Sequence, residues 1–445
     1  MKDMTTGSPI KNIFLFAIPV LLGNLFQNFY AIADSVIVGQ LLGVEALAAV
    51  GATSSIVFLV FGWIVGLTSG FGILISQAYG AGDEWYLKHY VAMSTYICLI
   101  FTIVMTVGLL TCNDMILHAM NIPENILGDT SVYICIIYMS IPISFIYNML
   151  TSIARALGDS KTPLYFLTLS SVINIGLDFL LVAKTPLGVA GAAYATLIAQ
   201  LVSAILCFIY VFRKYKEIHF AKEHSKINMQ SVKKLLGMGV PMGLQFSITA
   251  IGVMIVQSSL NTLGAIYIAA FAAAIKIQNI LMQVYIAMGA AVATYVGQNF
   301  GAGKIERIKK GVRQSVITGL ILTVFLMLFS YYFAGPLTRV FVTDNADDVV
   351  EIAKQYLHIC LWFYPWLGMI FTYRNALQGL GNGFMPMMGG VAELIARALI
   401  VMIFFEELQF VAICMSEAIA WVSALIPLIP YYYYYTRKLT KKMIS

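Results

Sequence analysis

Long apolar stretches, each near the length that crosses a bilayer, follow one another along almost the whole chain. A membrane-spanning helix needs about 20 mainly apolar residues. On that measure, the pattern of apolar and polar positions predicts twelve helices joined by short polar connections. Their expected limits are 12–41, 46–75, 91–111, 130–153, 164–184, 188–212, 235–261, 266–296, 314–334, 355–377, 387–405 and 410–434. The expected fold class is therefore an all-α polytopic membrane protein.

Composition points the same way, since 60% of the residues are hydrophobic and only 11% are charged. Soluble domains carry about 25% charged residues. The first apolar run is too long for a signal peptide and lacks a small-residue cleavage pattern, so we expect it to persist as a helix. The six cysteines show no paired spacing, which favours small core residues over a disulfide or metal framework.

The positive charges are distributed unevenly over the connections. Most of the 27 Lys and Arg residues fall at the two ends of the chain and in the even-numbered connections, including the run from Arg213 to Lys234. The odd-numbered connections hold only Lys184, Arg339 and Lys354. The positive-inside rule then predicts a multi-pass protein of the plasma membrane with both termini in the cytoplasm. The net charge of +6 is a topology signal, and no nucleic-acid partner is expected.

The two halves of the chain resemble each other. The segment "ISQAYGAGDEWYLKHYVAMS" (75–94) aligns with 296–315 at an offset of 221, Pro19 pairs with Pro241 at 222, and "LGDSKTP" (157–163) pairs with "LGNGFMP" (380–386) at 223. Each half holds six helices, an even number, so a pseudo-two-fold axis along the membrane normal is expected. The predicted parts are an N-lobe (1–212), a cytoplasmic linker (213–234) and a C-lobe (235–445). Transporters built from repeats commonly bind substrate between them, near the midplane.

The repeated "GAG" elements are expected to cap helices at their C-terminal ends, where positive φ favours glycine. The sequence contains no GxxxxGK[ST] motif, which excludes an ATP-driven pump for this chain alone. An intramembrane enzyme is disfavoured as well, because His358 is the one histidine within a predicted span and no HExxH motif occurs. We expect neither an enzymatic activity nor a cofactor.

Charged residues within spans are functional hypotheses by default, but a structural pairing must be weighed for each. Glu393 and Arg397 are spaced i,i+4, which favours an ion pair on one helix. Arg374 is close enough to a helix end to reach the cytoplasmic interface. Lys276 and Glu417 could pair with each other or line a cavity.

Asp34 and Asp178 are expected at one depth. Each lies six or seven residues below the outer end of its helix, about 9–11 Å at 1.5 Å per residue. Thr196 on the returning helix falls level with Asp178, and Asn174 precedes Asp178 by one turn on the same face. These oxygen-bearing groups could bind a hard cation such as Na⁺, or the carboxylates could hold a proton between them. The alternative is that Asn174 and Thr196 merely join helices, which leaves two buried carboxylates unexplained.

Taken together, "AIP" with Pro19, "ADSVIVGQLLG" (33–43), the two "QxxGAG" elements, "RALGDSKTP" (155–163) and "NIGLD" (174–178) resemble the MATE family, the multidrug and toxic compound extrusion transporters. The resemblance covers the whole chain. It implies twelve helices in two lobes around a central cleft, with export driven by Na⁺ or H⁺ antiport. The DinF-like branch of the family has a cation or proton site whose residues match Asp34, Asn174, Asp178 and Thr196.

The resemblance also suggests that the first helix bends when its Asp is protonated, with Pro19 as the hinge; a static kink is the alternative. Candidate cleft residues are Gln27, Tyr30 and Asn148. The implied cargo is an amphipathic, often cationic drug or toxic metabolite, carried by a monomer in the bilayer. A flippase or exporter of a lipid-linked or other native amphipathic metabolite remains the second hypothesis. The sequence does not choose between Na⁺ and H⁺.

Overall fold

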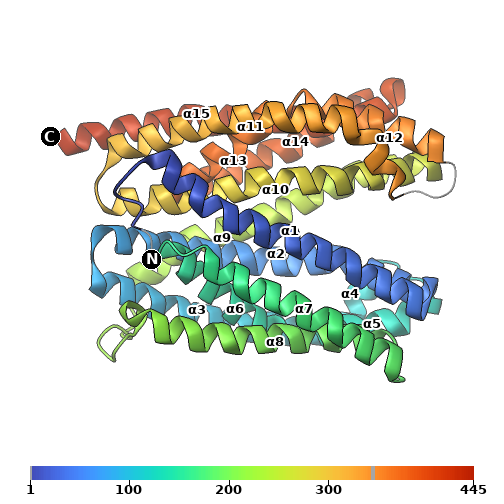
Figure 1. Cartoon of the computed structure of the whole chain (residues 1–445), viewed down its shortest axis with the longest axis horizontal. Coiled ribbons are helices and arrows are strands. Elements are labelled where there is room, and N and C mark those ends of the chain that lie inside the picture. The colour runs from blue at the N-terminus through green and yellow to red at the C-terminus, as the bar shows by residue number, and fades with distance from the viewer. Residues whose placement is uncertain (1–2, 342–345, 445) are drawn as a thin grey trace. The chain divides into compact units, whose positions relative to one another are not determined.

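The computed structural model describes residues 3–341 and 346–444, and every regular element within them is a helix (Figure 1). Two 3-10 helices, Lys216–Ile218 (η1) and Asn261–Leu263 (η2), accompany the α-helices. The α-helices are α1 (Pro9–Leu42), α2 (Val44–Ala81), α3 (Glu84–Thr111), α4 (Asn113–Ala119), α5 (Glu124–Met139), α6 (Ile141–Ala156), α7 (Lys161–Lys184), α8 (Val189–Lys214), α9 (Met229–Leu260), α10 (Ala265–Gly301), α11 (Ile305–Arg339), α12 (Ala346–Leu361), α13 (Tyr364–Gly379), α14 (Phe384–Leu408) and α15 (Phe410–Ile444).

Ten of these helices are long and apolar enough to cross a membrane, and the bent pair α5–α6 raises the number to eleven. The ten are α1, α2, α3, α7, α8, α9, α10, α11, α14 and α15. The expected all-α polytopic class is therefore confirmed.

Two predicted spans are not continuous helices. The span 130–153 is broken at Ser140, where α5 and α6 meet at 44°. The span 355–377 is broken between α12 and α13. In each case a proline, Pro142 or Pro365, lies in the first turn of the following helix. Proline has no N–H to donate and suits a first turn, so it starts a new helix there.

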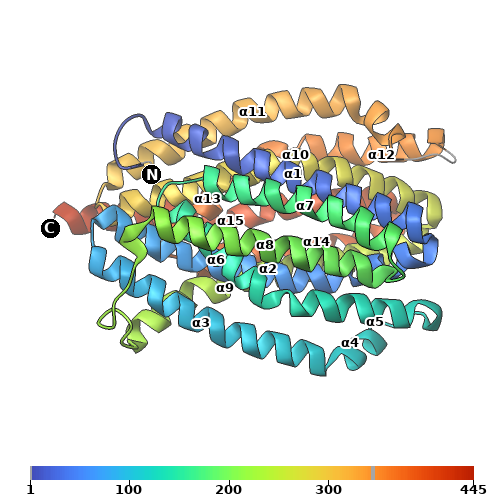
Figure 2. The ribbon, with the colours of Figure 1, turned by 60° about the horizontal axis from the view of Figure 1, so that its bottom comes forward.

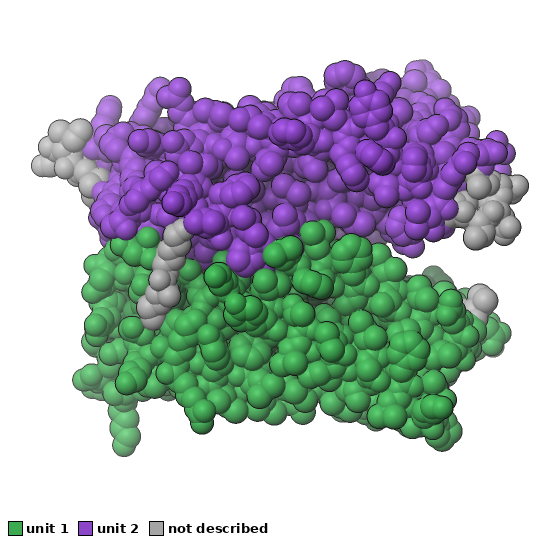
Figure 3. Space-filling view, in the orientation of Figure 1, with its two compact units in different colours: residues 1–3, 22–243 green, residues 4–21, 244–445 purple. Residues whose placement is uncertain are grey.

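The chain forms two compact units whose boundaries fall inside α1 and α9 (Figure 3). Unit 1 contains residues 1–3 and 22–243, and unit 2 contains residues 4–21 and 244–445. Pro19 and Pro241 each lie two residues before the point where their helix passes from one unit to the other. The sequence had placed the lobe boundary in the linker 213–234, which belongs to unit 1.

Close glycine packing explains why the first part of α9 belongs to unit 1. A Cβ added to Gly66 of α2 would lie 2.5 Å from the carbonyl oxygen of Met242, and one added to Gly70 would lie 2.6 Å from the Cα of Gly239. Small residues let two helix backbones approach this closely in a membrane. The start of α1 belongs to unit 2 because Ile13 and Phe16 are buried in its apolar core.

The predicted capping role of the "GAG" elements is confirmed. Gly82 ends α2 in the left-handed region (φ 69°), and its N–H donates to the carbonyl of Tyr79 at 3.1 Å. Gly303 adopts the same φ after α10 and donates to Phe300 at 3.0 Å. Both glycines thus satisfy helix-end carbonyls in a conformation that side chains disfavour.

Candidate functional site

The candidate site lies within unit 1, where α1, α7 and α8 bring four polar side chains together. Asp178 is completely buried and Asn174 is 2% exposed, one turn apart on the same face of α7. Thr196 on α8 and Asp34 on α1 are half-buried. These are the four residues that the sequence predicted as a cation or proton site.

Their contacts form one connected cluster. The Asn174 amide Nδ2 donates to the Thr196 hydroxyl at 3.2 Å, and the Tyr30 hydroxyl lies 3.4 Å from the same oxygen. The carboxyl groups of Asp34 and Asp178 lie within hydrogen-bonding reach of each other. The Oδ1 atom of Asp34 is buried and has no hydrogen-bond partner among the described residues.

This geometry restricts the charge that the cluster can carry. Two carboxylates at hydrogen-bonding distance repel each other if both are ionised, and burial leaves little water to screen them. A proton shared between Asp34 and Asp178 removes the repulsion. A hard cation bound by both carboxylates does the same, and the remaining amide and hydroxyl oxygens suit such an ion. The residues present therefore fit either coupling species.

Two tyrosines complete the surroundings of the site. The hydroxyl of Tyr30, a predicted cleft residue, lies 3.4 Å from the Thr196 hydroxyl, and its role in substrate binding stays a prediction. Tyr133 on α5 is 8% exposed and lies close enough to interact electrostatically with Asp34 and Asp178. The sequence interpretation missed Tyr133, which lies beside a second tyrosine, Tyr138, in the otherwise apolar run "VYICIIYM" and so gives no distinct signal.

Two further residues, Gln27 and Asn148, are predicted to line the cleft. Gln27 is exposed on α1. The Asn148 amide donates at 2.8 Å to the carbonyl of Ser144 on its own helix, α6. Their role in substrate binding stays a prediction.

The intramembrane charges of unit 2 pair differently from the expectation. Glu393 forms ion pairs with Arg374 on α13 and, at 3.6 Å, with Arg397 on its own helix α14. Arg397 also donates from Nε and Nη2 to both carboxylate oxygens of Glu417 on α15, at 3.1 and 3.0 Å. The i,i+4 pair predicted between Glu393 and Arg397 is present, but it is only one part of a four-residue chain.

The structure therefore corrects one expectation, for Arg374, and excludes one of the two alternatives for Lys276 and Glu417. Arg374 was expected to extend to the cytoplasmic interface, but it forms an ion pair with Glu393, in which both side chains are largely buried. Glu417 is paired with Arg397 rather than with Lys276. The Lys276 ammonium instead lies 5.4 Å from the centre of the Phe341 ring, a cation–π distance.

The motif "RALGDSKTP" holds the linker to unit 1. Asp159 accepts hydrogen bonds from the backbone N–H of Lys161 and of Thr162, from the Lys214 ammonium at 2.7 Å, and from the Tyr215 hydroxyl. Burial opposes ionisation of Asp159, but the bonds from Lys214, Thr162 and Tyr215 outweigh it and hold the pKa of its carboxyl well below its usual range. Burial and the neighbouring carboxylate raise the pKa of Tyr215 to about 12.

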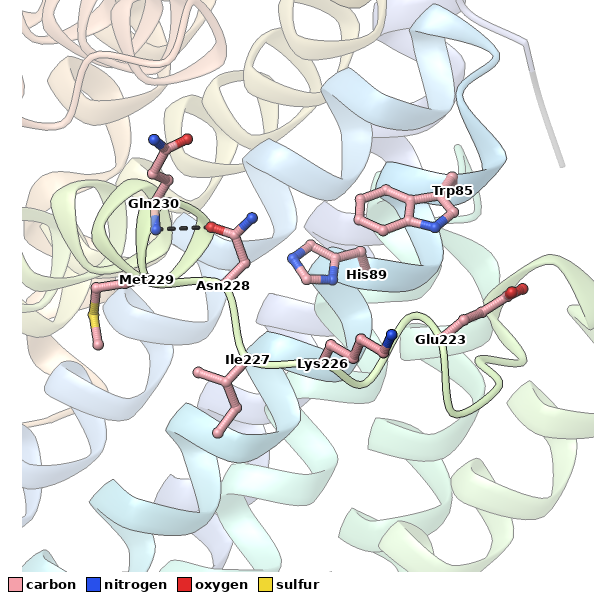
Figure 4. Close-up of a pocket in the computed structure, with 8 residues that line it drawn as sticks. All are labelled: Trp85, His89, Glu223, Lys226, Ile227, Asn228, Met229 and Gln230. Carbon is pink, nitrogen blue, oxygen red and sulfur yellow. Dashed lines mark hydrogen bonds between the residues drawn. The ribbon is translucent and has the colours of Figure 1, made fainter.

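A second attachment of the linker surrounds a pocket of about 610 Å³ (Figure 4). The ring of His89 on α3 is buried, with Nδ1 at 2.8 Å from the carbonyl of His224 and Nε2 at 3.0 Å from the Ser231 hydroxyl. Trp85 stacks on His89 with ring centres 4.8 Å apart. These contacts tie the linker and the start of α9 to α3.

The fold defines the class of protein, an all-helical polytopic membrane protein with ten candidate spans among its described residues. The MatE family model matches residues 19–180 and 241–403. The chain belongs to the MATE family, whose members are transporters and not enzymes. The family match occurs once in each half, with starting points at Pro19 and Pro241, in agreement with the internal repeat.

Three known proteins illustrate the similarity. The probable multidrug resistance protein YpnP of Bacillus subtilis is 30% identical over 379 residues, which cover 85% of this chain and 84% of YpnP. The FAD transporter of Shewanella oneidensis is 25% identical over 392 residues, 85% of this chain and 84% of that protein. A crystal structure of MATE in the bent conformation matches with a TM-score of 0.92 and 22% identity, covering 99% of this chain and 98% of that one.

Proposed function

We propose that the protein is a secondary active antiporter that exports amphipathic, often cationic, small molecules in exchange for Na⁺ or H⁺. The observation that carries this proposal is the contact between the carboxyl groups of Asp34 and Asp178 inside unit 1. An acid pair within membrane-spanning helices is costly, and such residues mark ion pathways and proton relays. The similarity to YpnP, a probable multidrug resistance protein, favours drugs as cargo.

In this mechanism the acid pair is the group that alternates between two charge states. When the coupling cation or proton is present, it neutralises the repulsion between Asp34 and Asp178, and the Asn174 and Thr196 oxygens complete its surroundings. When it leaves, the repulsion between the carboxylates favours a rearrangement of α1 relative to α7. Alternating access then couples release of the ion on one side to export of the substrate. We place the working protein in the plasma membrane as a monomer with cytoplasmic termini.

The test is transport in proteoliposomes with imposed Na⁺ and pH gradients, applied separately. Asp34→Asn and Asp178→Asn should each abolish gradient-driven export while the protein remains inserted, because each removes a negative charge at nearly constant size. Asp129→Asn, which alters an exposed acid on α5, is the matched control and should transport normally. Transport at wild-type rates by both site variants would refute the coupling role.

A second candidate cargo is a native amphipathic metabolite. One relative, 25% identical to this chain, is named as an FAD transporter, and its named cargo is a metabolite and not a drug. The same proteoliposomes, offered a panel of dyes, antibiotics and flavin nucleotides, separate the two. Gradient-driven uptake of the flavin nucleotide without uptake of any dye or antibiotic would favour the metabolite.

A further inference from the structure

The helices that carry the coupling site in unit 1 have counterparts in unit 2, and the register between them can be fixed. Helices α7 and α14 begin 223 residues apart. The glycines that precede them, Gly158 and Gly381, have the same offset and nearly equal φ values of 82° and 85°. The burial pattern agrees, because Asn174 and Asp178 are buried on α7 where Arg397 and Val401 are buried on α14.

The next helices, α8 and α15, match at an offset of 221. They begin at Val189 and Phe410, each preceded by a residue with positive φ: Gly188 at 55° and Gln409 at 46°. At this offset their burial patterns coincide along most of the first five turns. Thr196 of α8 therefore corresponds to Glu417 of α15.

In each unit a hydrogen-bonded pair of side chains joins the two corresponding helices, but the pair is neutral in unit 1 and charged in unit 2. In unit 1 the Asn174 amide donates to the Thr196 hydroxyl at 3.2 Å. In unit 2 the Arg397 guanidinium donates two hydrogen bonds to the Glu417 carboxylate, at 3.1 and 3.0 Å. The neutral pair Asn174–Thr196, which lies beside two acids, thus corresponds to the ion pair Arg397–Glu417, in which the arginine side chain supplies the positive charge.

The acids of the unit 1 site are missing from unit 2. Asp178 corresponds to Val401, and Asp34 falls at Ile255 or Val256 under the offsets of 221 and 222. Gly252 of α9 leaves room for the guanidinium of Arg397, because a Cβ added to Gly252 would lie only 3.2 Å from Arg397 Nη1. Unit 2 therefore binds a positive charge at the corresponding place, and that charge is covalently attached.

We propose that Arg397 is a tethered cation, which occupies in unit 2 the place that the exchangeable coupling ion takes in unit 1. The molecule then has a single exchangeable site, and unit 2 stays permanently in the loaded state. The neighbouring Glu393 and Arg374 neutralise each other, so Glu417 and Arg397 form a balanced pair. This inference rests on the proposed coupling function of Asp34 and Asp178.

Chemical rescue of Arg397→Ala tests the proposal. The variant leaves the Glu417 carboxylate buried without its cation, which should lower the melting temperature of the purified transporter by roughly 5 °C or more. Added guanidinium at low millimolar concentration should restore the melting temperature in a saturable manner, as binding to the folded state requires. Tetramethylammonium, which cannot donate a hydrogen bond, should not. Arg397→Lys is the matched control, and it should show no guanidinium response because it retains a tethered charge.

A second variant keeps the test decisive if Arg397→Ala does not fold. Arg397→Asn combined with Glu417→Thr copies the neutral pair of unit 1; it should fold and show no guanidinium response. Absence of rescue in folded Arg397→Ala, or equal rescue of the double variant, would overturn the proposal.

The failure of this inference can be told from failure of the coupling proposal. Rescue is read from stability alone and needs no transport. If Asp34→Asn transports normally while guanidinium still rescues Arg397→Ala, the proposed coupling site is wrong, and the result supports only a guanidinium-binding site beside Glu417. In an otherwise wild-type protein, Asp34→Asn should also remove all stabilisation by the coupling cation. Residual stabilisation that disappears with Glu417→Gln would mean that unit 2 has an exchangeable site after all.

Discussion

Thr196 shows how one hydroxyl can link the parts of a site. Its oxygen accepts a hydrogen bond from the Asn174 amide and lies at hydrogen-bonding distance from the Tyr30 hydroxyl, so residues of α1, α7 and α8 meet there. Because one atom serves both contacts, its loss frees two side chains at once. We therefore expect Thr196 to contribute to the affinity of the site for its cation.

Thr196→Ala should raise the cation concentration for half-maximal transport by roughly tenfold, the equivalent of about one to two lost hydrogen bonds. Thr196→Ser keeps the hydroxyl and should stay close to the wild type. The measurement is initial transport rate against the concentration of the coupling ion. Equal behaviour of the two variants would show that the hydroxyl does not contribute to ion binding.

Asp159 gives a prediction for pH. Its pKa in the folded protein lies below the value of about 3.9 for an unfolded chain, so the carboxylate stabilises the fold above that value. This stability should be fully present at neutral pH and should be lost as the pH falls through the folded-state pKa. Asp159→Asn should therefore lower the melting temperature at pH 7, and the difference from the wild type should shrink steadily below about pH 5. A difference that stays constant from pH 7 to pH 2 would contradict this assignment.

At the scale of the helices, α1 and α9 stand apart because each belongs to both units. Pro19 cannot donate the backbone hydrogen bond to the carbonyl of Leu15, so α1 is weakened close to the point where it changes units. In a membrane the freed carbonyl needs another partner, which makes such a bend adjustable. We therefore propose a hinge at this place, and a static kink is the alternative that the following experiment tests.

Pro19→Ala should straighten α1 and lower the maximal transport rate more than it changes the KM for substrate. Pro336→Ala is the matched control, because Pro336 lies inside α11, a helix that belongs wholly to unit 2. Maximal rate and KM of both variants in proteoliposomes give the comparison. If the two prolines have the same effect, Pro19 is a packing feature and the hinge must lie elsewhere.

Helix length and depth explain what the sequence could predict. A helix rises 1.5 Å per residue, so counting from the ends of two helices placed Asp34 and Asp178 at one level. Counting does not fix the rotation of a helix about its axis. For this reason two ion pairs between helices, that of Glu393 with Arg374 and that of Glu417 with Arg397, were not predicted, because they depend on the facing sides of α13, α14 and α15. The break at Ser140 was missed for a different reason, since Pro142 can be accommodated either in a kinked helix or in the first turn of a new one.

The distribution of charge over the whole molecule predicts its orientation. The linker 213–234 carries a run of Lys and Arg, whereas the connection that contains Glu124 lies in a region with few positive charges. Only an excess of Lys and Arg in short connections sets the orientation, so the linker should face the cytoplasm. The linker is attached to Asp159 and to His89, and Figure 2 shows it at the same end of unit 1 as the connection between α2 and α3 and the connection between α6 and α7.

Cysteine labelling in intact cells tests this orientation. Lys226→Cys in the linker and Glu124→Cys at the start of α5 both replace exposed residues. A membrane-impermeant maleimide should label Glu124→Cys from outside and should reach Lys226→Cys only after permeabilisation. The native cysteines are free, and two of them, Cys112 and Cys135, are half-buried, so both are changed to serine in the background protein, which is labelled in parallel. The reverse pattern would place the linker and both termini outside the cytoplasm and would reverse the direction in which Asp34 and Asp178 are expected to drive transport.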